Sequence, residues 1–242
     1  MTTIESDLKP LSAEESAFVD ATVRHAERVF RVFRETGTTT GYGTVNIAER
    51  IPGTDAHVSV SDPGPWAEDA TLRPVVFNND GTVRQGPAGA RGGFGFGKIL
   101  AAHENITTVV HVHAPHLGAW SQTHRPLPLH YVPVQRFTLA SEIATYTDRR
   151  QSQVDFILDR LNESPHHFAI LEANGGATVW GDRGLLATAE LITLLEEGAK
   201  YQILAEAIGG SQPYGPGVRR QAWSFHGLLA QAEAEGLLSA DG

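Results

Sequence analysis

The segment from Thr107 to Ala114 constrains the fold more than any other part of the chain. Its sequence, TTVVHVHA, is a run rich in β-branched residues that carries two histidines. Such a run is typical of a strand buried on both faces. A strand of this kind needs covering layers, and helical patterns precede and follow it along the chain. We therefore expect an α/β fold in which helices cover both faces of a mixed sheet.

The order of the other predicted elements agrees with such a sheet. Ser12 to Glu15 forms a capping box that opens a helix, and Gly37 ends it. Asn79-Asp80-Gly81 is a strong hairpin turn. Strands are expected at 42–49, 57–60, 73–78, 82–85, 107–114, 127–134, 168–173 and 177–180. Further helices are expected at 116–123, 138–162, 188–208 and 217–234, with a short one ending near 99–103.

Length, charge and composition exclude several classes of protein. The 242 residues suit one domain, 1–242, with a sizeable core. No apolar run is long enough to cross a membrane and no secretory signal is visible, so we expect a cytoplasmic protein. The net charge of −9 argues against nucleic-acid binding. Because the chain has no cysteine, a transition-metal site must use imidazole and oxygen ligands.

His111-Val112-His113 is the pattern that points most directly to chemistry. Side chains at i and i+2 of a strand lie on one face, so both imidazoles can approach a single ion. Imidazole is a common ligand of iron, zinc and other transition metals. His116 follows at the predicted strand end, where it can join the site. The alternative interpretation is a pair of hydrogen-bonded histidines at the end of a strand, since two protein ligands hold an ion poorly.

Four segments in sequence order resemble the class II aldolase/adducin family. They are TGYGTVNIAER, NNDGTVRQG, VVHVHAPHLGAW and FAILEANGGATVWG. The family shows a TGxxGNxS-like strand, a DG hairpin, VVHTHSP and LxxNHGxxxxG, and the match runs from about residue 13 to 210. The resemblance implies a three-layer α/β/α domain with a mixed, largely antiparallel sheet. It also implies a divalent metal ion, a small-molecule substrate and a homotetramer with sites between subunits.

The resemblance assigns roles to individual residues of this chain. His111 and His113 match the first two metal ligands, and Asn46 matches an asparagine that contacts substrate. Tyr131 lies where some aldolases carry a catalytic tyrosine that acts across the interface; the alternative is a buried aromatic. Lys98, beside a glycine-rich loop, is a candidate for binding an anionic substrate or is a solvated lysine of a turn. Asn174 is a further candidate for substrate binding.

Two positions depart from the family pattern. The third histidine ligand falls at Gly175, and the catalytic glutamate, nineteen residues before His111, falls at Gly92. A metal site would therefore need another third ligand. The candidates are His116, His103, His130, Asn174 and Glu172.

The departures leave three functions open. The first is a divergent lyase or decarboxylase that uses iron, zinc or manganese on a small carbonyl or keto-acid substrate. The second is a non-heme iron oxygenase of a secondary-metabolite pathway, for which two histidines and a carboxylate are the usual ligands. The third is a non-catalytic protein that keeps the fold, as the adducin head does. The sequence favours an enzyme over the non-catalytic role.

Overall fold

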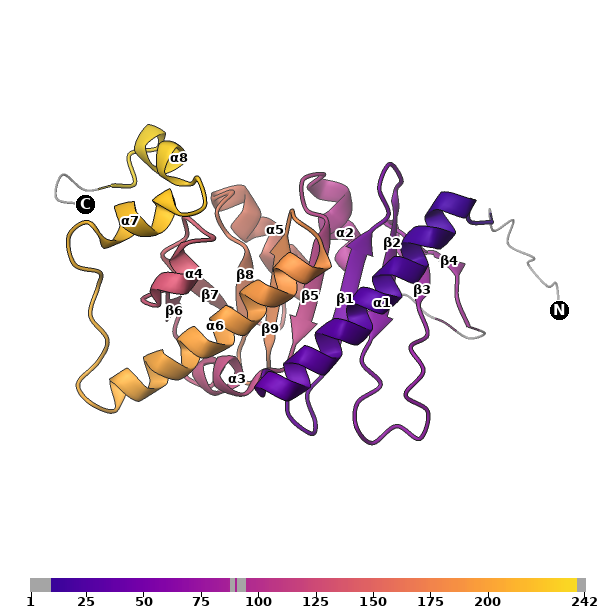
Figure 1. Ribbon diagram of the computed structural model, residues 1–242, viewed down its shortest axis with the longest axis horizontal. Coiled ribbons are helices and arrows are strands. Elements are labelled where there is room, and N and C mark those ends of the chain that lie inside the picture. The colour runs from indigo at the N-terminus through magenta and orange to yellow at the C-terminus, as the bar shows by residue number, and fades with distance from the viewer. Residues whose placement is uncertain (1–9, 88–89, 91–94, 239–242) are drawn as a thin grey trace.

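The computed structural model describes residues 10–87, 90 and 95–238 of the chain (Figure 1). The helices within these ranges are α1 (Ala13–Thr36), α2 (Phe96–Ala102), α3 (Pro115–Ser121), α4 (Val132–Gln135), α5 (Gln153–Glu163), α6 (Leu185–Glu206), α7 (Val218–Ser224) and α8 (Leu229–Ala234). The strands are β1 (Val45–Arg50), β2 (Ala56–Ser61), β3 (Val75–Asn78), β4 (Val83–Gln85), β5 (Thr108–Val112), β6 (Leu127–Pro128), β7 (Glu142–Tyr146), β8 (Ala169–Glu172) and β9 (Ala177–Gly181).

The strands form a mixed sheet in the order β4-β3-β2-β1-β5-β9-β8-β7-β6. Neighbouring strands run antiparallel except for β7 and β8, which pair in parallel. The predicted α/β class and the mixed, largely antiparallel sheet are therefore confirmed. The strand from which the prediction started, β5, lies between β1 and β9, near the centre of the sheet.

Helices cover both faces of this sheet, as expected. Along β5, Val110 and Val112 belong to the apolar core that α1 and α6 complete. Val109 points the other way, into the core that α2 and α5 complete. Figure 1 shows α1 and α6 crossing one face of the sheet diagonally, with α2 and α5 behind it. Because side chains alternate along a strand, His111 lies on the same face as Val109, on the side of α2 and α5.

Helix α1 begins and ends where the sequence predicts. Ser12 accepts a hydrogen bond from the Glu15 backbone, and the Glu15 side chain accepts one from the Ser12 backbone. At the other end Gly37 adopts φ 74°, a left-handed conformation that glycine adopts without steric cost. The apolar stripe of α1, including Phe30 and Phe33, is fully buried against the sheet.

The predicted hairpins are also present. Asn79, Asp80 and Gly81 connect β3 to β4, and Gly81 has φ 90°. β8 and β9 pair antiparallel around Asn174-Gly175-Gly176. This second hairpin follows one edge of β5 and brings its turn to the end of β5 that carries the histidines.

Three of the predicted segments are wrong in part. The range 138–162 is not mostly helical, because β7 pairs with β8 before α5 begins. This pairing is between distant segments and overrides the local helical pattern. The range 127–134 is extended only at β6, and α4 follows it. The final helix is divided into α7 and α8 around Gly227, whose φ is 75°. Among the described residues, no helix is long and apolar enough to cross a membrane.

Candidate active site

His111 and His113 lie together at the end of β5. Their ring centroids are 4.9 Å apart and the rings meet edge to face at 69°. His111 is buried, at 6% exposure, whereas His113 is exposed. The predicted proximity of the two imidazoles is therefore present in the structure, with one ring beneath the surface and the other at it.

A buried carboxylate holds His111 in place. Glu172 Oε1 lies 2.8 Å from His111 Nδ1. The same oxygen accepts hydrogen bonds from Gln153 Nε2 at 2.7 Å and from Thr178 Oγ1 at 2.9 Å. Burial opposes ionisation of Glu172, but the hydrogen bonds and the charge of His111 hold the pKa of Glu172 below its ordinary value. We infer that Glu172 is ionised and fixes the orientation of the His111 ring.

The sheet register aligns further polar side chains with His111. Asn46 of β1 and Thr178 of β9 are the direct partners of His111, so the three residues share one face. Asn46 Oδ1 accepts a hydrogen bond from Ser61 Oγ at 2.6 Å. Asn46 Nδ2 is buried and has no hydrogen-bond partner among the described residues. An unsatisfied buried donor costs free energy, which makes a ligand oxygen its natural partner.

The turn between β8 and β9 fits closely against His113. A Cβ on Gly176 would lie 2.2 Å from Val112 O and 2.6 Å from His113 Cδ2, so only glycine fits there. Gly175 has more room, since its Cβ would lie 3.3 Å from Glu172 O. The turn opens on Asn174, whose φ of 58° is left-handed. His113 therefore packs directly on Gly176.

Arg149 lies on the other side of this turn. Its Nη2 donates a hydrogen bond to Ala173 O at 3.0 Å, and its Nη1 lies 3.8 Å from Glu172 Oε2. The guanidinium also stacks on the Tyr146 ring, at 5.0 Å from the centroid. Its Nη2 is 3.7 Å from the place that a Cβ of residue 175 would occupy. Arg149 thus adds a permanent positive charge to the cluster around the turn.

The environment of His113 favours its neutral form. Desolvation and the neighbouring His111 lower the pKa of His113, and the charge of Glu172 only partly opposes them. A neutral imidazole at the surface can accept a proton. The cluster therefore combines a proton acceptor, a fixed cation and a buried amide donor.

Comparison with known proteins identifies the family. The sequence model of the family described as class II aldolase and adducin N-terminal domain matches residues 25–203 of this chain. The chain belongs to this family. A comparison with curated proteins finds no match.

Solved structures of class II aldolase proteins share the fold. An L-fuculose 1-phosphate aldolase is 14% identical with TM-score 0.63, and the alignment covers 91% of this chain and 99% of the aldolase. The L-fuculose 1-phosphate aldolase from Glaciozyma antarctica PI12 is 19% identical with TM-score 0.64, covering 95% and 92%. An aldolase II superfamily protein from Pseudomonas syringae is 17% identical with TM-score 0.64, covering 94% and 93%. At these identities the likeness establishes the fold alone.

The donor set does not fit the three-histidine metal site that the family resemblance implies. His111 and His113 supply two donors, and Gly175 supplies none. Glu172 is near, but its Oε1 already meets three protein groups. Across the described ranges, no three His, Asp or Glu side chains are arranged to hold a metal ion.

His116, the nearest candidate for a third ligand, is held elsewhere. Its Nδ1 lies 2.6 Å from Glu196 Oε1 of α6. The same carboxylate accepts hydrogen bonds from the backbone of His116 and Leu117, at the start of α3. Glu196 therefore caps α3 and draws the imidazole toward α6, on the face opposite His111.

Two other candidates for the third ligand are also held away from the histidine pair. His130 Nδ1 lies 2.9 Å from Ser211 Oγ. His103 lies at the C-terminal end of α2. The position of the missing catalytic glutamate, Gly92, lies outside the described residues.

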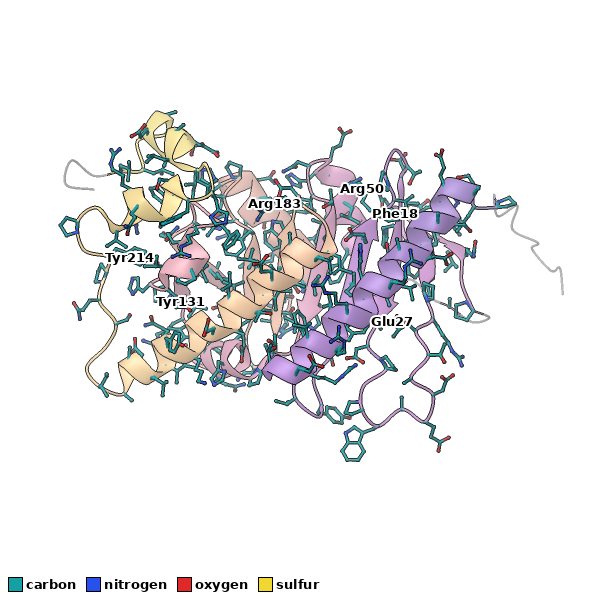
Figure 2. All side chains as sticks on the ribbon, in the orientation of Figure 1. Phe18, Glu27, Arg50, Tyr131, Arg183 and Tyr214 are labelled. Atoms are coloured by element: carbon teal, nitrogen blue, oxygen red, sulfur yellow. The ribbon has the colours of Figure 1, made fainter. Side chains whose placement is uncertain are left out.

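The remaining predicted site residues lie apart from the histidine pair. Tyr131 donates a hydrogen bond to Glu197 Oε2 at 2.7 Å, and Figure 2 shows it beside α4 and α6. Burial, followed by the bond to Glu197, raises the pKa of Tyr131 to about 12. Lys98 lines a cavity of about 80 Å³ with His57 and other residues of the α2 face.

Asn174 lies beside the cluster, but its side chain is already engaged. Its Oδ1 is 2.8 Å from His124 Nε2, and its Nδ2 donates to Gln122 Oε1 at 2.6 Å. The structure thus brings His111, His113 and Asn46 together on one face. It also brings Glu172 to His111, which the sequence named as a candidate third ligand, and it adds Gln153, Thr178 and Arg149, which the sequence did not name.

Proposed function

We propose that this protein is a lyase-type enzyme that cleaves a carbon–carbon bond beside the carbonyl of a small hydroxy-keto acid. The observation that carries the proposal is the position of Arg149. Its guanidinium lies 3.7 Å from the place where the side chain of residue 175 would begin. The family pattern has a histidine ligand at that position. A fixed cation in its place supports chemistry on a negatively charged substrate.

Arg149 is suited to hold the substrate carboxylate. A guanidinium offers a planar set of N–H donors that matches a carboxylate, and such charge-assisted bonds are the stronger ones. The side chain is 56% exposed, so its donors are accessible, while Ala173 and Tyr146 fix its orientation. The buried Nδ2 of Asn46 provides a second donor on the far side of His111 for a substrate oxygen.

His113 is suited to move the proton. It takes the proton of the hydroxyl group on the carbon that is β to the substrate carbonyl. The bond between the α and β carbons then breaks, and its electron pair moves to the carbonyl as an enolate. The β carbon leaves as an aldehyde, and His113 returns the proton to the α carbon. Atoms and electrons balance without an oxidant, and the neutral state of His113 supports its role as acceptor.

The divalent ion that the family resemblance implies is tested separately. His111 and His113 are the two residues that would hold it, and an ion there would polarise a carbonyl oxygen. His113 would then be a ligand of the ion instead of the proton acceptor. Because the chain supplies only two such donors, the steps above use its own residues. Elemental analysis of untagged protein, beside a His111→Ala/His113→Ala double variant, measures whether iron, zinc or manganese is bound at the pair.

A second candidate function rests on Glu172. Two histidines and a carboxylate are the usual ligands of non-heme iron oxygenases, and Glu172 lies beside His111. The engagement of its Oε1 by Gln153 and Thr178 weighs against this candidate. Stoichiometric iron that the double variant loses, together with oxygen uptake in the presence of keto acids, would favour the oxygenase over the lyase.

The lyase is tested by pyruvate release from a panel of γ-hydroxy-α-keto acids, coupled to lactate dehydrogenase. We expect Arg149→Gln to weaken substrate binding by about tenfold or more, the loss of one charged hydrogen bond. We expect His113→Gln to lower kcat by at least about a hundredfold. The matched control is Arg150→Gln, because Arg150 is adjacent, 91% exposed and bonded to Asp148.

Three results would count against this function. If Arg149→Gln and Arg150→Gln weaken substrate binding equally, the Arg149 guanidinium does not hold the substrate carboxylate. Full activity of His113→Gln would remove the proposed base. An absence of turnover across the panel, with no metal bound, would favour the non-catalytic role on this fold.

The assembly and location of the protein are proposed with the function. We propose a cytoplasmic homotetramer acting on a small molecule, as the family resemblance implies. Light scattering of the purified protein measures the assembly directly, and a monomer would contradict it.

A further inference from the structure

A second cavity lies at the end of the sheet opposite the histidine pair. It has a volume of about 480 Å³, within the range of small-molecule pockets. Trp180 and Gly181 line it, and in the sheet they pair with Val109 and Thr108 at the start of β5. His111 instead pairs with Thr178, which lies two residues before Trp180 and three before Gly181 in β9, roughly 7–10 Å along the strand. The cavity is therefore separate from the candidate active site.

Several parts of the chain build the walls of this cavity. They are residues 105–106 before β5, the segment 136–139 after α4, Leu161 of α5 with the segment 165–168, residues 180–183 at the end of β9, the first turns of α6, and residues 226–231 between α7 and α8 and in α8. The last of these lies beyond residue 203, where the match to the family ends. Much of the lining is apolar, with Leu139, Phe168 and Leu191 on different walls. A ligand of this cavity therefore needs an apolar body.

Two arginines give the cavity its charge. The Arg136 guanidinium stacks on the Phe225 ring at 4.9 Å, and its Nε is buried without a hydrogen-bond partner in the described part of the chain. Arg183 stacks on the Phe137 ring at 5.5 Å and lies near the start of α6, as Figure 2 shows. The acidic group on the wall is Asp182, which is 67% exposed and 3.9 Å from Arg183. The buried Nε of Arg136 therefore has no acidic partner from the wall.

The wall carries three histidines, His166, His167 and His226, and none of them accepts a hydrogen bond from Arg136 Nε. His166 Nε2 is bonded to Glu235 Oε2 at 2.5 Å. His226 packs on the Phe137 ring with centroids 4.3 Å apart. His166 and His226 thus contact other residues of the chain. An oxygen from outside the chain remains the natural acceptor for the buried guanidinium N–H.

We propose that this cavity is a second binding site, which takes a small carboxylate with an aromatic body. The carboxylate binds the Arg136 guanidinium, with Arg183 adding charge at the same wall. The aromatic body packs between the leucines and Phe168. This site is independent of the proposed lyase chemistry, because none of its lining residues belongs to the cluster around His111.

Isothermal titration calorimetry with naphthoate tests the proposal, with the neutral isostere naphthamide and inorganic phosphate as comparison ligands. We expect saturable binding of naphthoate and binding of naphthamide and phosphate that is weaker by about tenfold or more. Arg136→Gln should weaken naphthoate binding by a similar factor. Arg73→Gln, which removes an exposed arginine paired with Asp69, should leave it unchanged.

Further variants separate binding from folding and from the active site. Ala187→Phe fills the cavity from the first turns of α6 without removing a charge, so it should abolish naphthoate binding even if Arg136→Gln fails to fold. His111→Ala should leave naphthoate binding unchanged. Four results would each overturn the proposal. The first two are a wild type that does not bind naphthoate saturably, and one that binds naphthamide or phosphate as tightly as naphthoate. The other two are full naphthoate binding by Ala187→Phe and loss of naphthoate binding in His111→Ala.

Discussion

The turn between β8 and β9 allows a prediction from two adjacent glycines. A Cβ on Gly176 would lie 2.2 Å from Val112 O and 2.6 Å from His113 Cδ2. The Val112 carbonyl cannot yield easily, since Val112 belongs to β5, which pairs with β9 beside the turn. A Cβ on Gly175 would meet nothing closer than 3.3 Å. The same substitution by alanine should therefore have very different effects at the two positions.

The expected size of the effect follows from the cost of overpacking. An extra methyl group forced into a filled site lowers the free energy of unfolding by roughly 1–3 kcal/mol. Because the contact of 2.2 Å is so short, we expect Gly176→Ala to lower it by about 3 kcal/mol or more. For a chain of this size that corresponds to a fall in Tm of about 6–12 °C. Gly175→Ala should change the free energy of unfolding by less than about 1 kcal/mol, because alanine also lowers the entropy of the unfolded chain.

Urea unfolding followed by tryptophan fluorescence, together with thermal scans, measures both variants. Gly176→Ala should also displace the His113 ring, so the proposed lyase activity should fall by more than the loss of stability explains. The reasoning is refuted if the two variants have equal free energies of unfolding, or if Gly176→Ala is as stable as the wild type.

Two further predictions concern charge and metal. Burial raises the pKa of Glu49 to about 7 from 4.5, so the folded chain holds an extra proton between these pH values. The free energy of unfolding should therefore fall by up to about 3 kcal/mol as pH rises through that window, and Glu49→Gln should lose this slope in urea titrations. Gly175→His should restore a third imidazole and raise zinc content toward one ion per chain by elemental analysis; unchanged zinc content would contradict the inferred ligand position.

The fold was largely predictable because its signals are local. The capping box at Ser12, the left-handed Gly37 and the Asn79-Asp80-Gly81 turn each depend on a few neighbouring residues. The β-branched run of β5 likewise indicates a buried strand without reference to its partners. Where the signal was not local, as for β7, the prediction was wrong, because the partner strand β8 decides the conformation.

Local spacing predicted only the histidine pair of the candidate site, and the family resemblance added Asn46. His111 and His113 meet because residues two apart on a strand share a face. Gln153 and Arg149 reach the same place from α5 and the loop before it. Nothing in their local sequence distinguishes Arg149 from Arg150, yet one lies over the site and the other is bonded to Asp148 in solvent.

The sequence by itself determined the α/β class, the family and the pair of histidines, since these depend on periodicity, turn residues and short motifs. It also determined that Gly175 breaks the metal-ligand pattern. Only the tertiary structure decided which side chains lie near Gly175. Pairing of β8 with β7 and β9 brings Glu172 to His111 and Arg149 to the turn. Contacts between segments so far apart in the chain are set by packing of the whole sheet, which no local pattern encodes.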